Sequence, residues 1–89
     1  MVTSRQIRKV NRDIAKIELK IENLEDKLVG IKEQKEQGKI TKAKHQKAKM
    51  NISTKIRALR TAIARKKKAR ATFEKRIRDK QAEEEEDSL

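Results

Sequence analysis

Apolar residues in the first third of the chain recur alternately every three and four positions. They are Ile7, Val10, Ile14, Ile17, Ile21, Leu24, Leu28 and Ile31. A mean spacing of 3.5 residues places these side chains along one side of an α-helix, as is typical of a helix that packs against another helix. The pattern therefore predicts a helix over about residues 4–36.

A second helix is predicted over about residues 41–82, because Ile52, Ile56, Leu59 and Ile63 repeat the alternating spacing. Gly38 suits the position that follows a helix C-terminus, where a left-handed backbone is common. Thr41 suits the N-cap of the next helix, because its hydroxyl can accept a hydrogen bond from a free backbone N–H. The turn is therefore expected at residues 37–40.

Two helices joined by a short turn predict an all-α fold, an antiparallel two-helix coiled-coil hairpin over residues 1–82 with a longer, basic second helix. The expected seam consists of Ile14, Ile17, Ile21, Leu24, Ile52, Ile56, Leu59 and Ile63. A turn centred on Gly38 predicts that Leu24 faces Ile52 and Ile17 faces Leu59. The same register places Glu18 beside Arg60, which is favourable, and Lys20 near Lys55, which is not. Because each helix would have one packed face, dimerisation into a four-helix bundle is an open alternative.

The charge is distributed unevenly along the chain. Residues 39–80 contain 17 Lys and Arg but only Glu74 and Asp79, whereas residues 1–38 contain nine basic and seven acidic side chains. The last residues, 83–89, include five consecutive acids and are expected to form a flexible acidic tail, because acids near a helix C-terminus oppose its dipole. A net charge of +12 favours a polyanionic partner.

The strongest candidate site is the basic run from Arg65 to Arg70, which covers more than a full helical turn and is expected to be positive all round. Lys66 and Arg70 also continue the seam spacing past Ile63, where they are expected to face Val10 and Ile7. The candidate nucleic-acid-binding residues are Arg57, Arg60, Arg65, Lys66, Lys67, Lys68, Arg70, Lys75, Arg76 and Arg78. Phe73 and Ile77 lie near the end of the second helix and are a candidate docking spot for a protein partner.

Several other functions are excluded by the residues the chain lacks. It has no Cys, which rules out a thiolate zinc site, and its single His, His45, has no acidic neighbour positioned to orient it, so no catalytic residue, metal or cofactor is expected. No segment has the length and apolarity of a signal peptide or membrane span. We therefore expect a non-enzymatic cytoplasmic or nucleoid-associated protein that does not bind membranes.

The composition and predicted architecture are similar to those of small helical ribosomal proteins, which lay basic helices against ribosomal RNA. This resemblance implies binding to structured RNA in a ribonucleoprotein. The chain has no aromatic platform for stacking bases and no recognition element for a DNA groove, so phosphate contacts are expected to dominate. A DNA-binding nucleoid or chromatin protein, and a coiled-coil adaptor or assembly factor, remain the alternatives.

Overall fold

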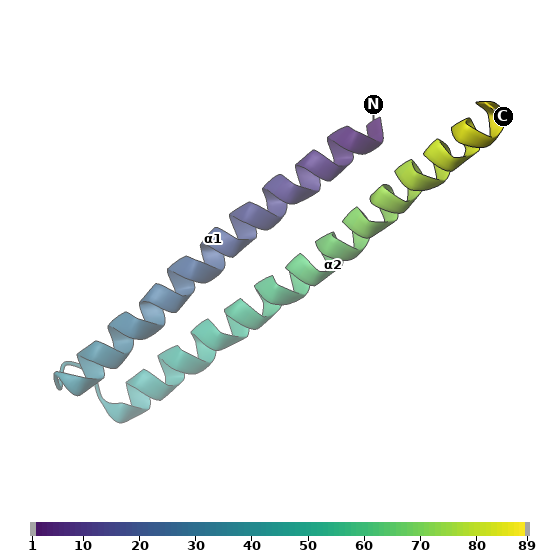
Figure 1. The fold of residues 1–89 in the computed structure, drawn as a ribbon. Coiled ribbons are helices and arrows are strands. Elements are labelled where there is room, and N and C mark those ends of the chain that lie inside the picture. Colours follow the sequence, from purple (N-terminus) through teal and green to yellow (C-terminus); the bar gives the residue numbers. More distant parts are fainter. Residues whose placement is uncertain (1, 89) are drawn as a thin grey trace.

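The protein is an antiparallel pair of long helices. The computed structural model describes the backbone of residues 2–88 and the side chains of residues 4–85. Within this range the chain forms α1 (Val2–Glu36) and α2 (Lys42–Ser88), and no strand. The helices lie side by side with both termini at one end of a rod whose extents are 73 × 16 × 15 Å (Figure 1). The predicted all-α hairpin with a longer second helix is confirmed.

The connection between the helices is fixed by backbone hydrogen bonds. Gly38 has a φ of 75°, and its N–H donates to the carbonyl of Lys35 at 3.0 Å. The N–H of Lys39 donates to the carbonyl of Gln34 at 2.8 Å. These two bonds form a Schellman motif that terminates α1. Thr41 Oγ1 accepts the N–H of Lys44 at 3.2 Å, so both predicted helix caps are confirmed.

Both helices extend further than the spacing predicted. The first helix begins at Val2 instead of near residue 4. The second continues to Ser88, so the helix end predicted near 82 is too early. The sequence argument considered only repulsion and the helix dipole at residues 83–87, whereas Glu, Gln and Ala are strong helix formers whose propensity favours continuation. The flexibility of residues 83–89 stays a prediction.

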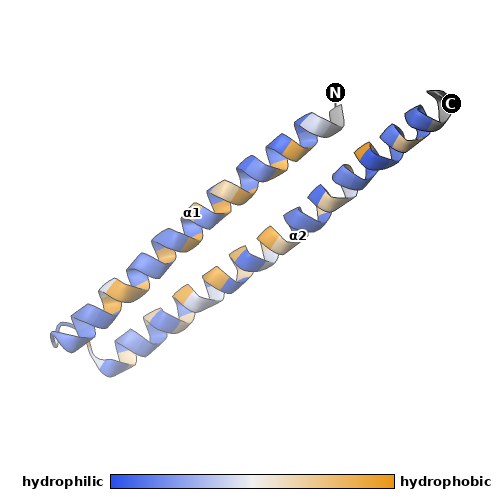
Figure 2. Cartoon of the chain, in the orientation of Figure 1, coloured by the Kyte–Doolittle hydropathy of each residue, from blue (hydrophilic) through white to orange (hydrophobic). Residues whose placement is uncertain are grey.

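The apolar seam is narrow and partly accessible to solvent. Ile14 and Ile56 are each 6% exposed and are the only hydrophobic residues in the buried class among the described side chains. The other predicted seam residues are half-buried. On α2 the hydrophobic positions are interrupted by long hydrophilic stretches toward both ends (Figure 2). A pair of helices covers only one side of each member, so the seam has an apolar centre and open flanks.

The contacts between the helices are displaced from the predicted register by three to seven residues, about one to two helical turns. Leu28 lies in the same hollow as Ile56, and Leu24 lies in the same hollow as Leu59. The turn at Gly38 predicted instead that Leu24 faces Ile52. The turn is only one residue longer than predicted, since α2 begins at Lys42 instead of near residue 41. Most of the difference arises because the prediction centred the pairing on Gly38, whereas the observed contacts are centred on positions that follow Gly38.

Candidate nucleic-acid interface

The basic run of α2 lies on the half of the helix remote from the turn. Lys66 and Arg70 within this run are half-buried, whereas Arg65, Lys67 and Lys68 are exposed. The sequence predicted a run that is positive all round the helix. Only part of the run is exposed to solvent in the hairpin. The cations of the candidate site fall into two groups, one held against other parts of the protein and one directed to solvent.

Two candidate residues contact α1 through hydrogen bonds and occupy the seam. Lys66 Nζ donates to Asp13 Oδ2 at 3.3 Å. Arg70 Nη1 donates to Asn11 Oδ1 at 2.9 Å, and its Nε lies 3.8 Å from Glu74 Oε1. Their place in the seam agrees with the spacing past Ile63. In the free protein these two side chains join the helices.

Two further candidate residues also interact within the chain. Arg60 Nη2 lies 3.3 Å from Glu25 Oε1, instead of beside Glu18 as the predicted register placed it. The Arg76 guanidinium lies 5.8 Å from the centroid of the Phe73 ring, a distance typical of a cation–π contact. Arg57 forms no such contact but lines a hollow with Glu25 and Arg60.

The remaining candidate cations form a solvent-exposed group on the outward side of α2. They are Arg65, Lys67, Lys68, Lys75 and Arg78, all exposed. Successive residues are ~100° apart around a helix, so this group falls within an arc of ~160° that is centred opposite the seam positions. None of the five side-chain cations forms a hydrogen bond or ion pair with another described residue. We call these five residues the outer cation face.

Three lysines outside the predicted site come together on the flank of the hairpin. Lys20 and Lys27 of α1 and Lys55 of α2 line one hollow with Asn23, Leu24, Ala58 and Leu59. No acidic residue lines this hollow. The sequence contained two signals for this cluster: Lys20 and Lys27 are seven residues apart, and Lys20 was expected near Lys55. The predicted proximity of Lys20 and Lys55 indicated only a repulsion that disfavours the hairpin.

Phe73 and Ile77 are less accessible than a docking spot at a free helix end requires. Phe73 is half-buried and lines a hollow with Gln6 and Val10 of α1. Ile77 is also half-buried. The displaced register places Gln6 and Val10 of α1 beside Phe73. Docking of a protein at these two residues stays a prediction.

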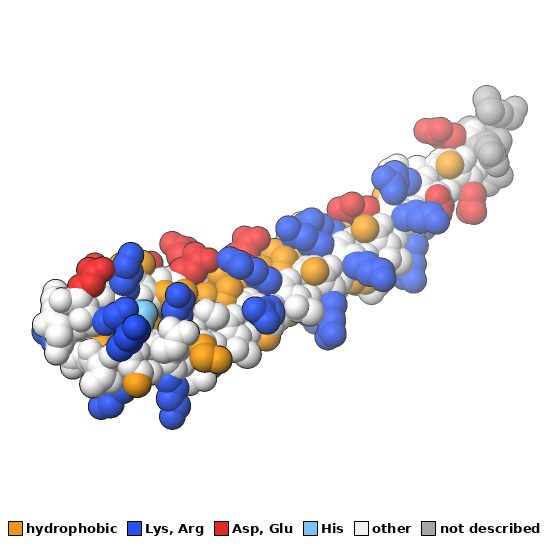
Figure 3. Space-filling model, turned by 90° about the horizontal axis from the view of Figure 1, so that it is seen from below, with side chains coloured by type: hydrophobic (Ala, Val, Ile, Leu, Met, Phe, Trp, Pro, Cys, Tyr) orange, Lys and Arg blue, Asp and Glu red, His pale blue; other side chains and the backbone are white. Residues whose placement is uncertain are grey.

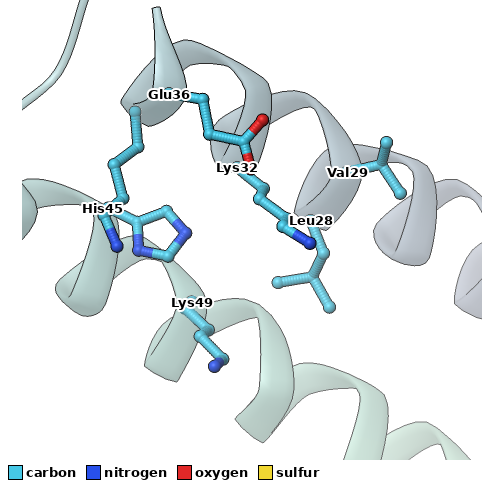
Figure 4. A pocket seen from close by; sticks show the side chains of 7 residues that line it. Leu28, Val29, Lys32, Glu36, His45 and Lys49 are labelled. Carbon is cyan, nitrogen blue, oxygen red and sulfur yellow. The ribbon is translucent and has the colours of Figure 1, made fainter. Parts of the chain in front are cut away.

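The single histidine lies in a hollow close to the turn. His45 and Lys49 of α2 face Leu28, Lys32 and Glu36 of α1 there (Figure 4). No carboxylate forms an ion pair with His45 among the described residues. The described part of the chain also contains no cluster of three or more His, Cys, Asp or Glu side chains that could hold a metal ion. Neither described helix is long and apolar enough to cross a membrane.

No protein-family model matches the chain, and comparisons with curated proteins and with solved structures gave no significant match.

Proposed function

We propose that this chain is a non-enzymatic nucleic-acid-binding protein that contacts phosphates through α2, with structured RNA in a ribonucleoprotein such as the ribosome as its target. The observation that carries the proposal is the outer cation face, which presents five exposed and unpaired cations between residues 65 and 78. Counterion release from phosphates makes such a surface bind polyanions without reading base sequence.

The shape of the hairpin supports contact with the phosphate backbone over insertion into a groove. The rod is 16 by 15 Å across, whereas the major groove of B-DNA is ~12 Å wide and accepts one helix. The major groove of an RNA helix is narrower still. Where the helices are paired, the protein therefore lies against the outside of a duplex or a folded RNA.

A salt titration with a charge-reversed variant tests the proposal. Binding to an RNA hairpin and to a DNA duplex of equal stem length is measured over a range of salt concentrations. Phosphate contacts by several cations predict a slope of about −4 to −6 for log K against log salt on the DNA duplex. Charge reversal in R65E/K67E/K68E should reduce the magnitude of this slope by at least ~2.7, because three contacts are lost.

The matched control is K42E/K44E/K47E, which makes the same charge change at the other end of α2. If both variants lose the same affinity, net charge explains binding and the outer cation face is not the site. Preference for the RNA hairpin supports a ribonucleoprotein role. Equal affinity for the two nucleic acids, or preference for the DNA duplex, favours the nucleoid alternative. Absence of binding by the unmodified protein at moderate salt contradicts the proposal.

A coiled-coil adaptor or assembly factor is the second candidate function. It is favoured by three large apolar side chains, Leu19, Val29 and Met50, which are 57%, 57% and 62% exposed. An adaptor would retain its protein partner after charge reversal at residues 65, 67 and 68, and would lose it after Ile17→Asp disrupts the seam. A nucleic-acid-binding protein predicts loss of binding on charge reversal while the helices stay intact.

A further inference from the structure

One long flank of the hairpin carries basic residues from both helices. The hollow around Lys20, Lys27 and Lys55 lies on this flank. A second hollow contains Lys9 and Asp13 of α1 with Arg65 and Lys66 of α2. Asp13, Lys20 and Lys27 are seven residues apart, so they share one helix side, and the two hollows follow each other along the same flank.

We call this flank the lysine edge and define it by Lys9, Lys20, Lys27, Lys55 and Arg65. All five residues are exposed, and none forms an ion pair with another described residue. The one acid that lines either hollow, Asp13, accepts a hydrogen bond from Lys66 and is partly neutralised by it. The edge therefore has an uncompensated positive charge contributed by both helices.

The opposite flank has a different charge balance. Its hollow contains Glu25 together with Arg57 and Arg60, and the Glu25–Arg60 ion pair joins the two helices there. In Figure 3 acidic side chains lie among Lys and Arg along one long edge of the hairpin, whereas the other edge over the same stretch carries Lys and Arg. The excess of positive charge is thus larger on one flank of the paired helices than on the other.

The lysine edge is unfavourable for the isolated protein. Closing the hairpin brings Lys55 to the same hollow as Lys20 and Lys27, and like charges at short range repel each other. A bound polyanion removes this repulsion. The span from Lys9 to Lys27 is ~27 Å along α1, so several phosphates of one nucleic-acid segment can lie along it. A phosphate backbone therefore suits the sign of the charge on the edge.

We propose that the backbone of the bound nucleic acid runs along the lysine edge, so that α1 contacts phosphates as well as α2. This inference rests on the proposed function and goes beyond it by adding three α1 lysines to the interface. Arg65 belongs to both the outer cation face and the lysine edge. It therefore marks where the backbone passes from one surface to the other.

The test compares K20Q/K27Q/K55Q with a matched control, K32Q/K39Q/K47Q, which removes the same charge at exposed positions away from the lysine edge. Salt titrations use the same RNA hairpin and DNA duplex. On the duplex, the slope of log K against log salt should fall in magnitude by ~2.7 for the lysine-edge variant. For the control it should fall by less than ~0.9, the equivalent of one phosphate contact. Without ligand, the melting temperature of the lysine-edge variant should not fall, because repulsion has been relieved.

Two results would overturn the inference while leaving the proposed function intact. The first is an equal loss of slope in both glutamine variants. The second is an unchanged slope in K20Q/K27Q/K55Q when R65E/K67E/K68E loses binding. If the triple variant does not fold, the single variant K20Q tests the same surface, and the magnitude of its salt slope should fall by ~0.9. Absence of binding by the unmodified protein would remove both proposals together.

Discussion

The two glycines of the chain should respond in opposite directions to the same substitution. Gly30 lies within α1, and a Cβ added there would meet no heavy atom within 4 Å. Gly30→Ala therefore changes helix propensity alone and should raise the free energy of unfolding by ~1 kcal/mol. Gly38 has the same open surroundings but a φ of +75°. Gly38→Ala should lower the free energy of unfolding by ~1–2 kcal/mol, the cost of a left-handed L-residue.

Because neither substitution introduces a steric contact, the pair isolates backbone conformation. The expected difference between the variants is ~2–3 kcal/mol. In a two-state domain of this size 1 kcal/mol shifts the melting temperature by ~4–8 °C, so the two variants should separate by ~8–24 °C. Thermal unfolding followed by far-UV circular dichroism at several protein concentrations measures this and detects any contribution from association. A melting temperature that rises in both variants would refute the Schellman geometry at Gly38.

Three further experiments test the seam, the cap and the ion pair by urea denaturation. Ile56→Ala should cost ~2–5 kcal/mol, because Ile56 is 6% exposed, whereas Leu19→Ala, at a position 57% exposed, should change stability by less than ~0.5 kcal/mol. Thr41→Ala should cost ~0.5–2 kcal/mol by removing the hydroxyl that accepts the Lys44 N–H; an unchanged midpoint would contradict this capping role. A double-mutant cycle of Arg60→Ala and Glu25→Ala should give a coupling below ~1 kcal/mol, since the side chains are 66% and 52% exposed, and a larger value would contradict the solvent-screened geometry.

The helices and their caps could be predicted from the sequence because each depends on local information. The alternating spacing from Ile7 to Ile31 requires one helix side to be apolar. Gly38 and Thr41 each act through hydrogen bonds to residues within five positions along the chain. Such short-range determinants are visible in the residues themselves.

The register could not be predicted, because the spacing fits more than one pairing of the helices. Sliding one apolar seam along another by one or two turns still places apolar residues opposite apolar residues, so the spacing alone does not select a register. The prediction centred the pairing on Gly38, whereas the observed contacts are centred on positions that follow Gly38. Arg60 therefore pairs with Glu25 instead of Glu18.

The candidate site shows the same division between local and tertiary information. The excess of cations in α2 is evident from the sequence, as is the seam position of Lys66 and Arg70. Which cations remain unpaired depends on acids and amides of α1, such as Asp13 and Asn11, that are more than fifty residues away along the chain. The cluster of Lys20 and Lys27 with Lys55 likewise requires the two helices to be placed together.

The bonds from Lys66 to Asp13 and from Arg70 to Asn11 connect ligand binding with the separation of the helices. An anion that draws either cation away from its partner on α1 would compete with helix closure at this end of the rod. Thermodynamic linkage makes the competition reciprocal, because anything that tightens the contact between the helices there weakens binding by the same factor. The lysine edge has the opposite linkage, since neutralising its charge favours the closed hairpin. A single polyanion can therefore loosen the terminal end of the hairpin while tightening its middle.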